Sequence, residues 1–152
     1  MSWAGWIVVG YVAIVTVPLT VIDVREHRLP NRLVVPGIGV ALALAFVQLA
    51  LSGWRDWQPL ACGAGYFALM LALSVAGGLG MGDVKLAALL GAASGFLGWQ
   101  ACVASLCAAF VLGGLVAGAL WLAKRRGRIP FGPFMLAGFW LTTTIALVQL
   151  AS

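Results

Sequence analysis

Charged residues are scarce in this chain of 152 residues. Aspartate and glutamate together number four, lysine and arginine nine, and histidine one. Only 9% of the residues are charged, whereas a soluble domain has about 25%. Hydrophobic residues make up 63% of the chain, which excludes an ordinary water-soluble domain and indicates an integral membrane protein.

Residues that bind metals or form disulfide frameworks are also few. The three cysteines, Cys62, Cys102 and Cys107, lie inside apolar runs, with no CxxC pair and no neighbouring histidine. Structural zinc sites and disulfide frameworks need such residues at short, regular spacings. We therefore expect the cysteines to be small core residues, and we expect no metal and no cofactor.

Long apolar runs fill most of the chain, each close to the roughly 20 residues that a membrane-spanning helix needs. They predict an all-α membrane protein, a polytopic bundle of about six transmembrane helices with short loops. The loops are too short for a soluble domain, so we expect a single transmembrane domain over residues 1–152. The expected helices cover residues 3–22, 33–51, 60–77, 81–98, 101–123 and 133–150.

Basic residues are distributed unevenly between the two ends of these helices. Counting alternate loops places eight on one side and only Arg55 on the other. The positive-inside rule makes the richer side cytoplasmic and puts both termini outside. Membrane topology and lipid head groups account for these charges, so we expect a bilayer and no nucleic acid as partner. The eight residues are Arg25, Arg28, Arg32, Lys85, Lys124, Arg125, Arg126 and Arg128.

Two of the four acidic residues stand out. Asp56 is expected to be solvated in an outer loop, and Glu26 to pair with a basic neighbour. Asp23 follows the first apolar run and Asp83 precedes the fourth. Because these two helices run in opposite directions, both carboxylates fall at the cytoplasmic edge. Ionisable groups in membrane segments suggest function, and a carboxylate pair sharing a proton activates water for peptide hydrolysis without a metal.

Asp83 also has a structural interpretation, because an aspartate before an apolar run is a favoured helix cap. From Val84 to Gly98 the run has 15 residues, about 22 Å of helix, which is short of a hydrocarbon core of about 30 Å. A spanning helix must therefore begin near Met81, which places Asp83 in its first turns. Lys85 points away from Asp83 and is expected to extend toward lipid phosphates. On spacing alone, cap and catalyst both stay open.

Three motifs at the cytoplasmic loops point to one family. "GMGDVK" (80–85) resembles the GxGD signature of intramembrane aspartyl proteases. Together with "DVREHRLPN" (23–31) and "IPFGPF" (129–134), it resembles the type IV prepilin peptidase family. Three motifs in order are more specific than GxGD alone, and the resemblance covers nearly the whole chain.

The resemblance implies that Asp23 and Asp83 form a catalytic pair. It implies an endopeptidase that removes the short basic leader of pilin or pseudopilin precursors at the cytoplasmic face of a bacterial or archaeal membrane. Gly80 and Gly82 would leave the start of the fourth helix bare for the substrate backbone. The residues expected to bind substrate or support the site are Gly80, Gly82, Lys85, Pro30, Asn31, Pro130, Gly132 and Pro133.

The chain contains no CxxC motif of the bifunctional members that also methylate pilin. It therefore resembles the short, peptidase-only members that serve tight-adherence (Flp-type) pili or archaeal flagellins, and S-adenosylmethionine is not expected. Presenilin-like enzymes share GxGD but pair it with Tyr-Asp and Pro-Ala-Leu motifs that are absent here. A small transporter using the two aspartates and a non-catalytic pilus-assembly component are the alternatives. The scissile bond, the oligomeric state and the role of each aspartate stay open.

Overall fold

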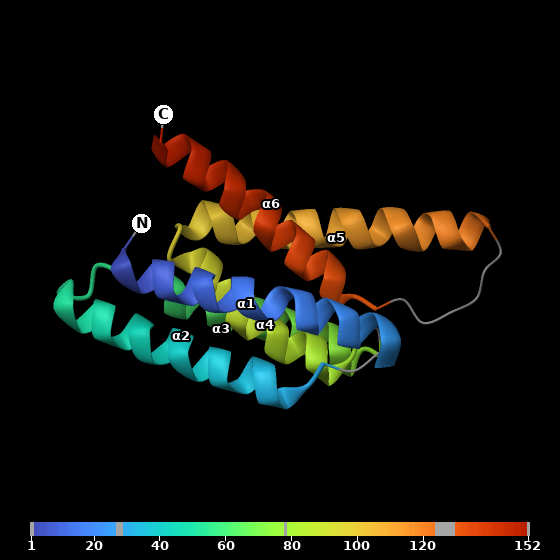
Figure 1. The fold of residues 1–152 in the computed structure, drawn as a ribbon, viewed down its shortest axis with the longest axis horizontal. Coiled ribbons are helices and arrows are strands. Elements are labelled where there is room, and N and C mark those ends of the chain that lie inside the picture. The colour runs from blue at the N-terminus through green and yellow to red at the C-terminus, as the bar shows by residue number, and fades with distance from the viewer. Residues whose placement is uncertain (1, 27–28, 78, 124–129, 152) are drawn as a thin grey trace.

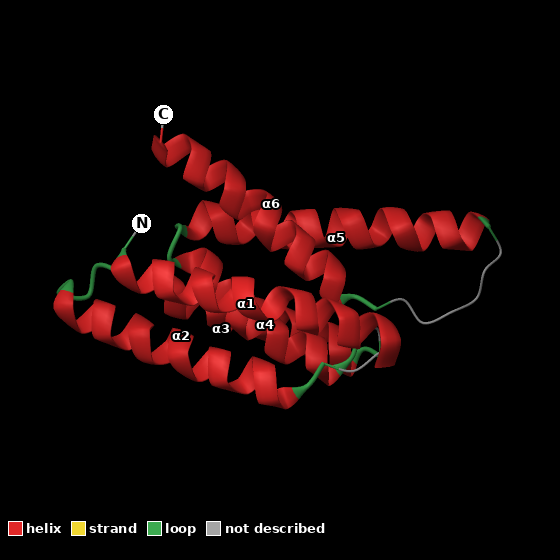
Figure 2. Ribbon diagram, viewed as in Figure 1, coloured by secondary structure: helices red, strands yellow, loops and turns green. Residues whose placement is uncertain are grey.

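The computed structural model describes residues 2–26, 29–77, 79–123 and 130–151 (Figure 1). All regular structure in these residues is helical, which confirms the predicted all-α fold (Figure 2). The helices are α1 (Trp3–Glu26), α2 (Asn31–Leu51), α3 (Gln58–Val75), α4 (Met81–Gly95), α5 (Trp99–Leu122) and α6 (Gly132–Ala151).

Five of these helices, all but α4, are long and apolar enough to cross a membrane. The α4 helix has 15 residues and a length of about 22 Å, too short for a hydrocarbon core of about 30 Å. Ten of its residues are buried, and it contacts each of the other five helices. It is therefore the central helix of the bundle, and it is not one of the five candidate membrane-spanning helices. It begins at Met81, the start that was predicted from the length of the apolar run. It ends at Gly95, three residues before the expected end at residue 98.

The two helix boundaries beside the "DVREHRLPN" motif differ from the expected ones. The α1 helix continues to Glu26, four residues beyond residue 22, so Asp23 lies within the helix rather than after it. The α2 helix begins at Asn31, two residues before residue 33. Pro30 precedes it with extended backbone angles (φ −71°, ψ 121°), because proline fits directly before a helix and cannot continue the previous one.

Glycines allow the helices to pack as two hairpins, α3 with α4 and α5 with α6. A Cβ atom added to Gly91 would lie 2.6 Å from the carbonyl oxygen of Cys62, and one added to Gly95 would lie 2.6 Å from Cα of Pro59. On α6, a Cβ atom at Gly138 would lie 2.7 Å from the amide nitrogen of Ala109. Each contact brings two backbones to a separation that any side chain would prevent.

The alternating chain direction gathers the sequence motifs at one end of the bundle. The C-terminal end of α1 and the N-terminal ends of α2, α4 and α6 lie toward the same end (Figure 1). Arg25, Arg32 and Lys85 belong to these helix ends. The other basic residues counted for topology on this side lie outside the described residues: Arg28, Lys124, Arg125, Arg126 and Arg128.

Candidate active site

Asp23 is the one acidic residue that is fully buried in the described part of the chain, with 4% of its surface exposed. Its Oδ2 atom accepts a hydrogen bond of 3.1 Å from the backbone N–H of Gly132. Gly132 is the first residue of α6, and the first amides of a helix have no partner within that helix. The positive end of the α6 dipole therefore meets the Asp23 carboxylate.

The "IPFGPF" motif brings this amide to Asp23. A Cβ atom at Gly132 would lie 2.6 Å from Asp23 Oδ2, so only glycine fits at this close approach. The Phe131 ring packs 5.4 Å from the ring of Phe110 on α5 and lies over Gly113. Pro133 stands in the first turn of α6, where no N–H is needed, and Pro130 is half-buried before it. The motif thus anchors the start of α6 on α5 and leaves its first amide free for Asp23.

Asp83 lies at the third position of α4, with Gly80 as the residue that caps this helix. Its Oδ2 atom accepts a hydrogen bond of 3.3 Å from the backbone N–H of Gly80. Asp83 is therefore not the cap residue itself, but its carboxylate stabilises the start of the helix as the third residue of a capping box does. The capping and catalytic interpretations are compatible in this geometry.

The two carboxylates lie close enough to interact electrostatically. Asp83, outside the five spans, has its pKa raised from 3.8 to about 6, first by burial and second by the negative charge of Asp23. The hydrogen bond from Gly80 acts in the opposite direction. Desolvation and a like charge both favour the neutral acid. Asp83 is therefore protonated at a higher pH than an ordinary aspartate, a property that an aspartyl protease needs in one member of its carboxyl pair.

Leu29 connects the two halves of the site, a role that the sequence did not predict. A Cβ atom at Gly82 would lie 3.0 Å from Leu29 Cβ, and one at Gly132 would lie 3.6 Å from Leu29 Cδ1. Leu29 thus packs between the start of α4 and the start of α6. In this structure it fills the space beside Gly82 that was expected to be bare, whereas Gly80 is exposed.

Lys85 and Asn31 are brought together from different motifs. The Lys85 Nζ atom donates a hydrogen bond of 2.9 Å to Asn31 Oδ1. This contact links the first turns of α4 to the first residue of α2. Lys85 therefore has a protein partner, where the sequence had suggested lipid phosphates.

The two remaining acidic residues are Asp56 and Glu26. Asp56 lies in the loop at the opposite end, as expected; it is partly exposed and accepts a hydrogen bond of 2.9 Å from Gln48 Nε2. Glu26 is exposed. The described residues contain no group of three or more His, Cys, Asp or Glu side chains that could hold a metal ion.

Comparison with known proteins identifies the family. Residues 10–118, a range that includes both aspartates, match the type IV leader peptidase family. The chain belongs to this family. The "IPFGPF" motif lies beyond the matched range, so the contact between Gly132 and Asp23 is a structural observation made independently of that match.

The family's curated members include similar proteins from several bacteria. A prepilin leader peptidase/N-methyltransferase of Pseudomonas putida is 35% identical over 149 residues, which cover 85% of this chain and 49% of that protein. Proteins of the same name from Aeromonas hydrophila and Xanthomonas campestris are 34% and 33% identical, over 84% and 90% of this chain. The chain spans about half the length of these relatives. No solved structure matches it.

Proposed function

We propose that this protein is a membrane-embedded aspartyl endopeptidase that removes the leader of type IV pilin-like precursors. The observation that carries the proposal is the proximity of the Asp23 and Asp83 carboxyl groups. They come from two different helices and interact electrostatically. Each accepts a hydrogen bond from the backbone N–H of a glycine. The relatives named prepilin leader peptidase/N-methyltransferase support the same reaction.

In the proposed reaction the pair holds one proton. The ionised carboxylate takes a proton from water, and the water oxygen attacks the scissile carbonyl carbon while the protonated carboxyl donates its proton to the carbonyl oxygen. Collapse of the tetrahedral intermediate breaks the C–N bond: the leaving amine takes up the proton held by the first carboxyl, and one hydroxyl of the intermediate returns its proton to the second carboxyl as the new carbonyl forms. The pair returns to its starting protonation state. The two aspartates titrate as a unit, so the proposal assigns the roles to the pair.

The position of the site suits a precursor anchored in the membrane. Asp23 and Asp83 lie near helix ends, where the precursor's leader, outside the bilayer, meets its apolar helix. We propose that this end faces the cytoplasm, since Arg25, Arg32 and Lys85 lie at it and Arg55 lies at the other. A basic leader on the same side would then reach the carboxylates directly.

The test is cleavage of two precursors, one type IV and one Flp-type, by the purified protein in detergent. The wild type should yield a shortened product, and Asp23→Asn and Asp83→Asn should each lower the rate by at least about 100-fold. Asp56→Asn is the matched control and should cleave at the wild-type rate. Thermal unfolding of each variant shows that it is folded. A folded Asp83→Asn protein that still processes precursor would overturn the proposal. Absence of cleavage by the wild type would favour a transporter or an assembly component.

A further inference from the structure

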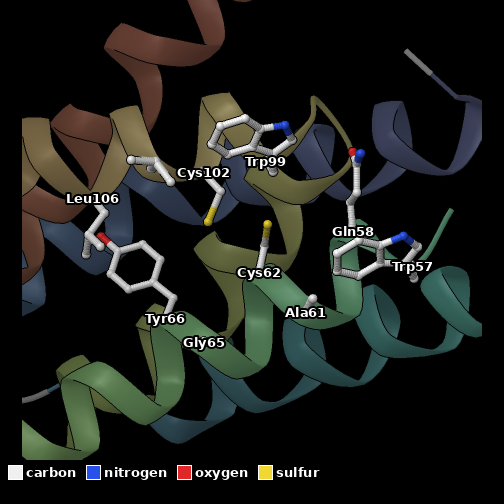
Figure 3. Close-up of a pocket in the computed structure, with 10 residues that line it drawn as sticks. Trp57, Gln58, Ala61, Cys62, Gly65, Tyr66, Trp99, Cys102 and Leu106 are labelled. Atoms are coloured by element: carbon white, nitrogen blue, oxygen red, sulfur yellow. The ribbon is translucent and has the colours of Figure 1, made fainter.

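A second feature lies at the end of the bundle opposite the aspartates. A cavity of about 270 Å³ opens between α3 and α5, near the residues where these two helices begin. Trp57 and Trp99 line it and are exposed, while Tyr66 lines it from within and is buried (Figure 3). The cavity is apolar and accessible to small apolar reagents.

Two cysteines face each other across this cavity. Cys62 on α3 and Cys102 on α5 point their sulfur atoms toward one another (Figure 3). Both thiols are free, and they lie close enough to interact electrostatically. Cys107, one turn and a half further along α5, is exposed and does not line the cavity. The structure therefore separates a facing pair from a single thiol.

The backbone that carries Cys62 packs closely against α4. A Cβ atom added to Gly95 of α4 would lie 3.0 Å from Cys62 Cβ, and one added to Gly91 would meet the Cys62 carbonyl oxygen at 2.6 Å. Cys62 thus packs directly on the central helix, and Cys102 is 8% exposed on the facing helix. A disulfide bond requires two sulfur atoms already facing each other from backbones of fixed separation.

We propose that Cys62 and Cys102 form a reversible disulfide bond that ties the α3–α4 hairpin to the α5–α6 hairpin. The thiolate of one cysteine attacks an external disulfide, RS–SR, and releases one RS⁻. The second cysteine attacks the resulting mixed disulfide and releases the other. Two cysteine thiols are oxidised, one external disulfide is reduced to two thiols, and the two protons pass to the released thiolates.

The two hairpins that this disulfide would connect each contribute residues to the site of Asp23 and Asp83. Asp83 belongs to the α3–α4 hairpin, and Gly132, which binds Asp23, belongs to the α5–α6 hairpin. A bond between α3 and α5 at the far end limits how far the two hairpins can separate. Under the orientation given above, the cysteines lie toward the outer compartment, where disulfides persist. The bond itself does not depend on peptidase activity.

The experiment uses the full chain with Cys107→Ser, purified in detergent and treated with 2,2′-dithiodipyridine, a small apolar disulfide. The facing pair should release two pyridinethiones per chain and retain no thiopyridyl adduct, and a cross-linked Cys62–Cys102 peptide should appear. Adding Cys62→Ser should stop the reaction at one pyridinethione, with the adduct retained on Cys102. Dithiothreitol should restore both thiols in the parent chain.

Thermal unfolding in detergent supplies a second readout. The oxidised chain should unfold at a higher temperature than the reduced chain, and the treated Cys62→Ser protein should show no such rise. Retained adducts on Cys62 and Cys102 in the parent chain, or thiols that stay unreacted, would overturn the proposal. A mapped disulfide without any rise in unfolding temperature would overturn the tie between the hairpins. None of these results depends on whether a precursor is cleaved.

Discussion

The backbone N–H of Gly132 donates a hydrogen bond of 3.1 Å to Oδ2 of Asp23, although 109 residues separate them in the chain. The contact makes the N-terminus of α6 part of the carboxylate site. The N-terminus of α4 has the corresponding role for Asp83 through Gly80. Each aspartate thus accepts a hydrogen bond from a backbone N–H at the start of a helix.

Gly132→Ala should disrupt the Asp23 half of the site. The added methyl group would lie 2.6 Å from Asp23 Oδ2, so the carboxylate or α6 must move. We expect a loss of about 1–3 kcal/mol in the free energy of unfolding and at least a tenfold loss of precursor cleavage. Gly114→Ala is the matched control, because an added Cβ atom there meets nothing within 4 Å. If Gly132→Ala cleaved precursor at the wild-type rate, the close contact between Gly132 and the Asp23 carboxylate would not be needed for cleavage.

Phe131→Ala should loosen the start of α6. The ring packs against Phe110, with 5.4 Å between ring centroids, and covers Gly113. Its removal should cost about 2–4 kcal/mol of unfolding free energy and lower cleavage, because Gly132 would lose its fixed distance to Asp23. Phe46→Ala, at a position that is 59% exposed, removes a ring from the lipid-facing surface and should leave cleavage unchanged. Equal effects of the two substitutions would refute a specific role for Phe131.

Lys85 and Asn31 should be energetically coupled. Lys85→Met and Asn31→Ala each remove the 2.9 Å hydrogen bond between α4 and α2. In a double-mutant cycle, the free energies of unfolding should show a coupling of about 0.5–1.5 kcal/mol, since the bond involves one charged group at an exposed position. The same cycle on cleavage rates tests whether the contact positions α4. Strictly additive effects would mean that the hydrogen bond contributes nothing in the membrane-extracted protein.

Asp83→Asn should stabilise the protein at neutral pH but not in acid. The pKa of Asp83 is raised to about 6 in the folded protein from an ordinary 3.8, so folding opposes its ionisation. The wild-type stability should therefore fall as pH rises from about 4 to about 6 and level off above that. Asparagine is neutral throughout and avoids this loss, by about 1–2 kcal/mol once the partial exposure of Asp83 is allowed for. Unfolding measured at about pH 4 and about pH 7.5 tests this, and equal differences at both would contradict it.

The sequence predicted the features that follow from the chain's own direction and composition. Apolar runs of helical length indicated the all-α bundle, and the shortness of the run after Asp83 correctly placed the start of α4 at Met81. Alternating chain direction was enough to bring Asp23 and Asp83 to one end. The same reasoning treated α4 as a spanning helix, because composition alone does not distinguish a lipid-facing apolar helix from one buried among other helices.

Contacts that depend on helix rotation could not be predicted. In a membrane bundle, apolar residues cover every helix face, so periodicity does not show which face points inward. The positions of Leu29 between two glycines, of Lys85 on Asn31, and of Cys62 opposite Cys102 all depend on such rotations. The "IPFGPF" motif was recognised by resemblance, but the contact of its Gly132 amide with Asp23 appeared only in the structure.

The 109-residue separation of Asp23 and Gly132 also sets an order on biosynthesis. Asp23 leaves the ribosome with α1, long before α6 exists, and during that interval its carboxylate has no helix N-terminus from α6 to hold it. Both aspartates are present once α4 has been made, yet the amide that orients the first of them arrives only with the insertion of α6. A nascent chain is therefore without its complete site until α6 has been inserted.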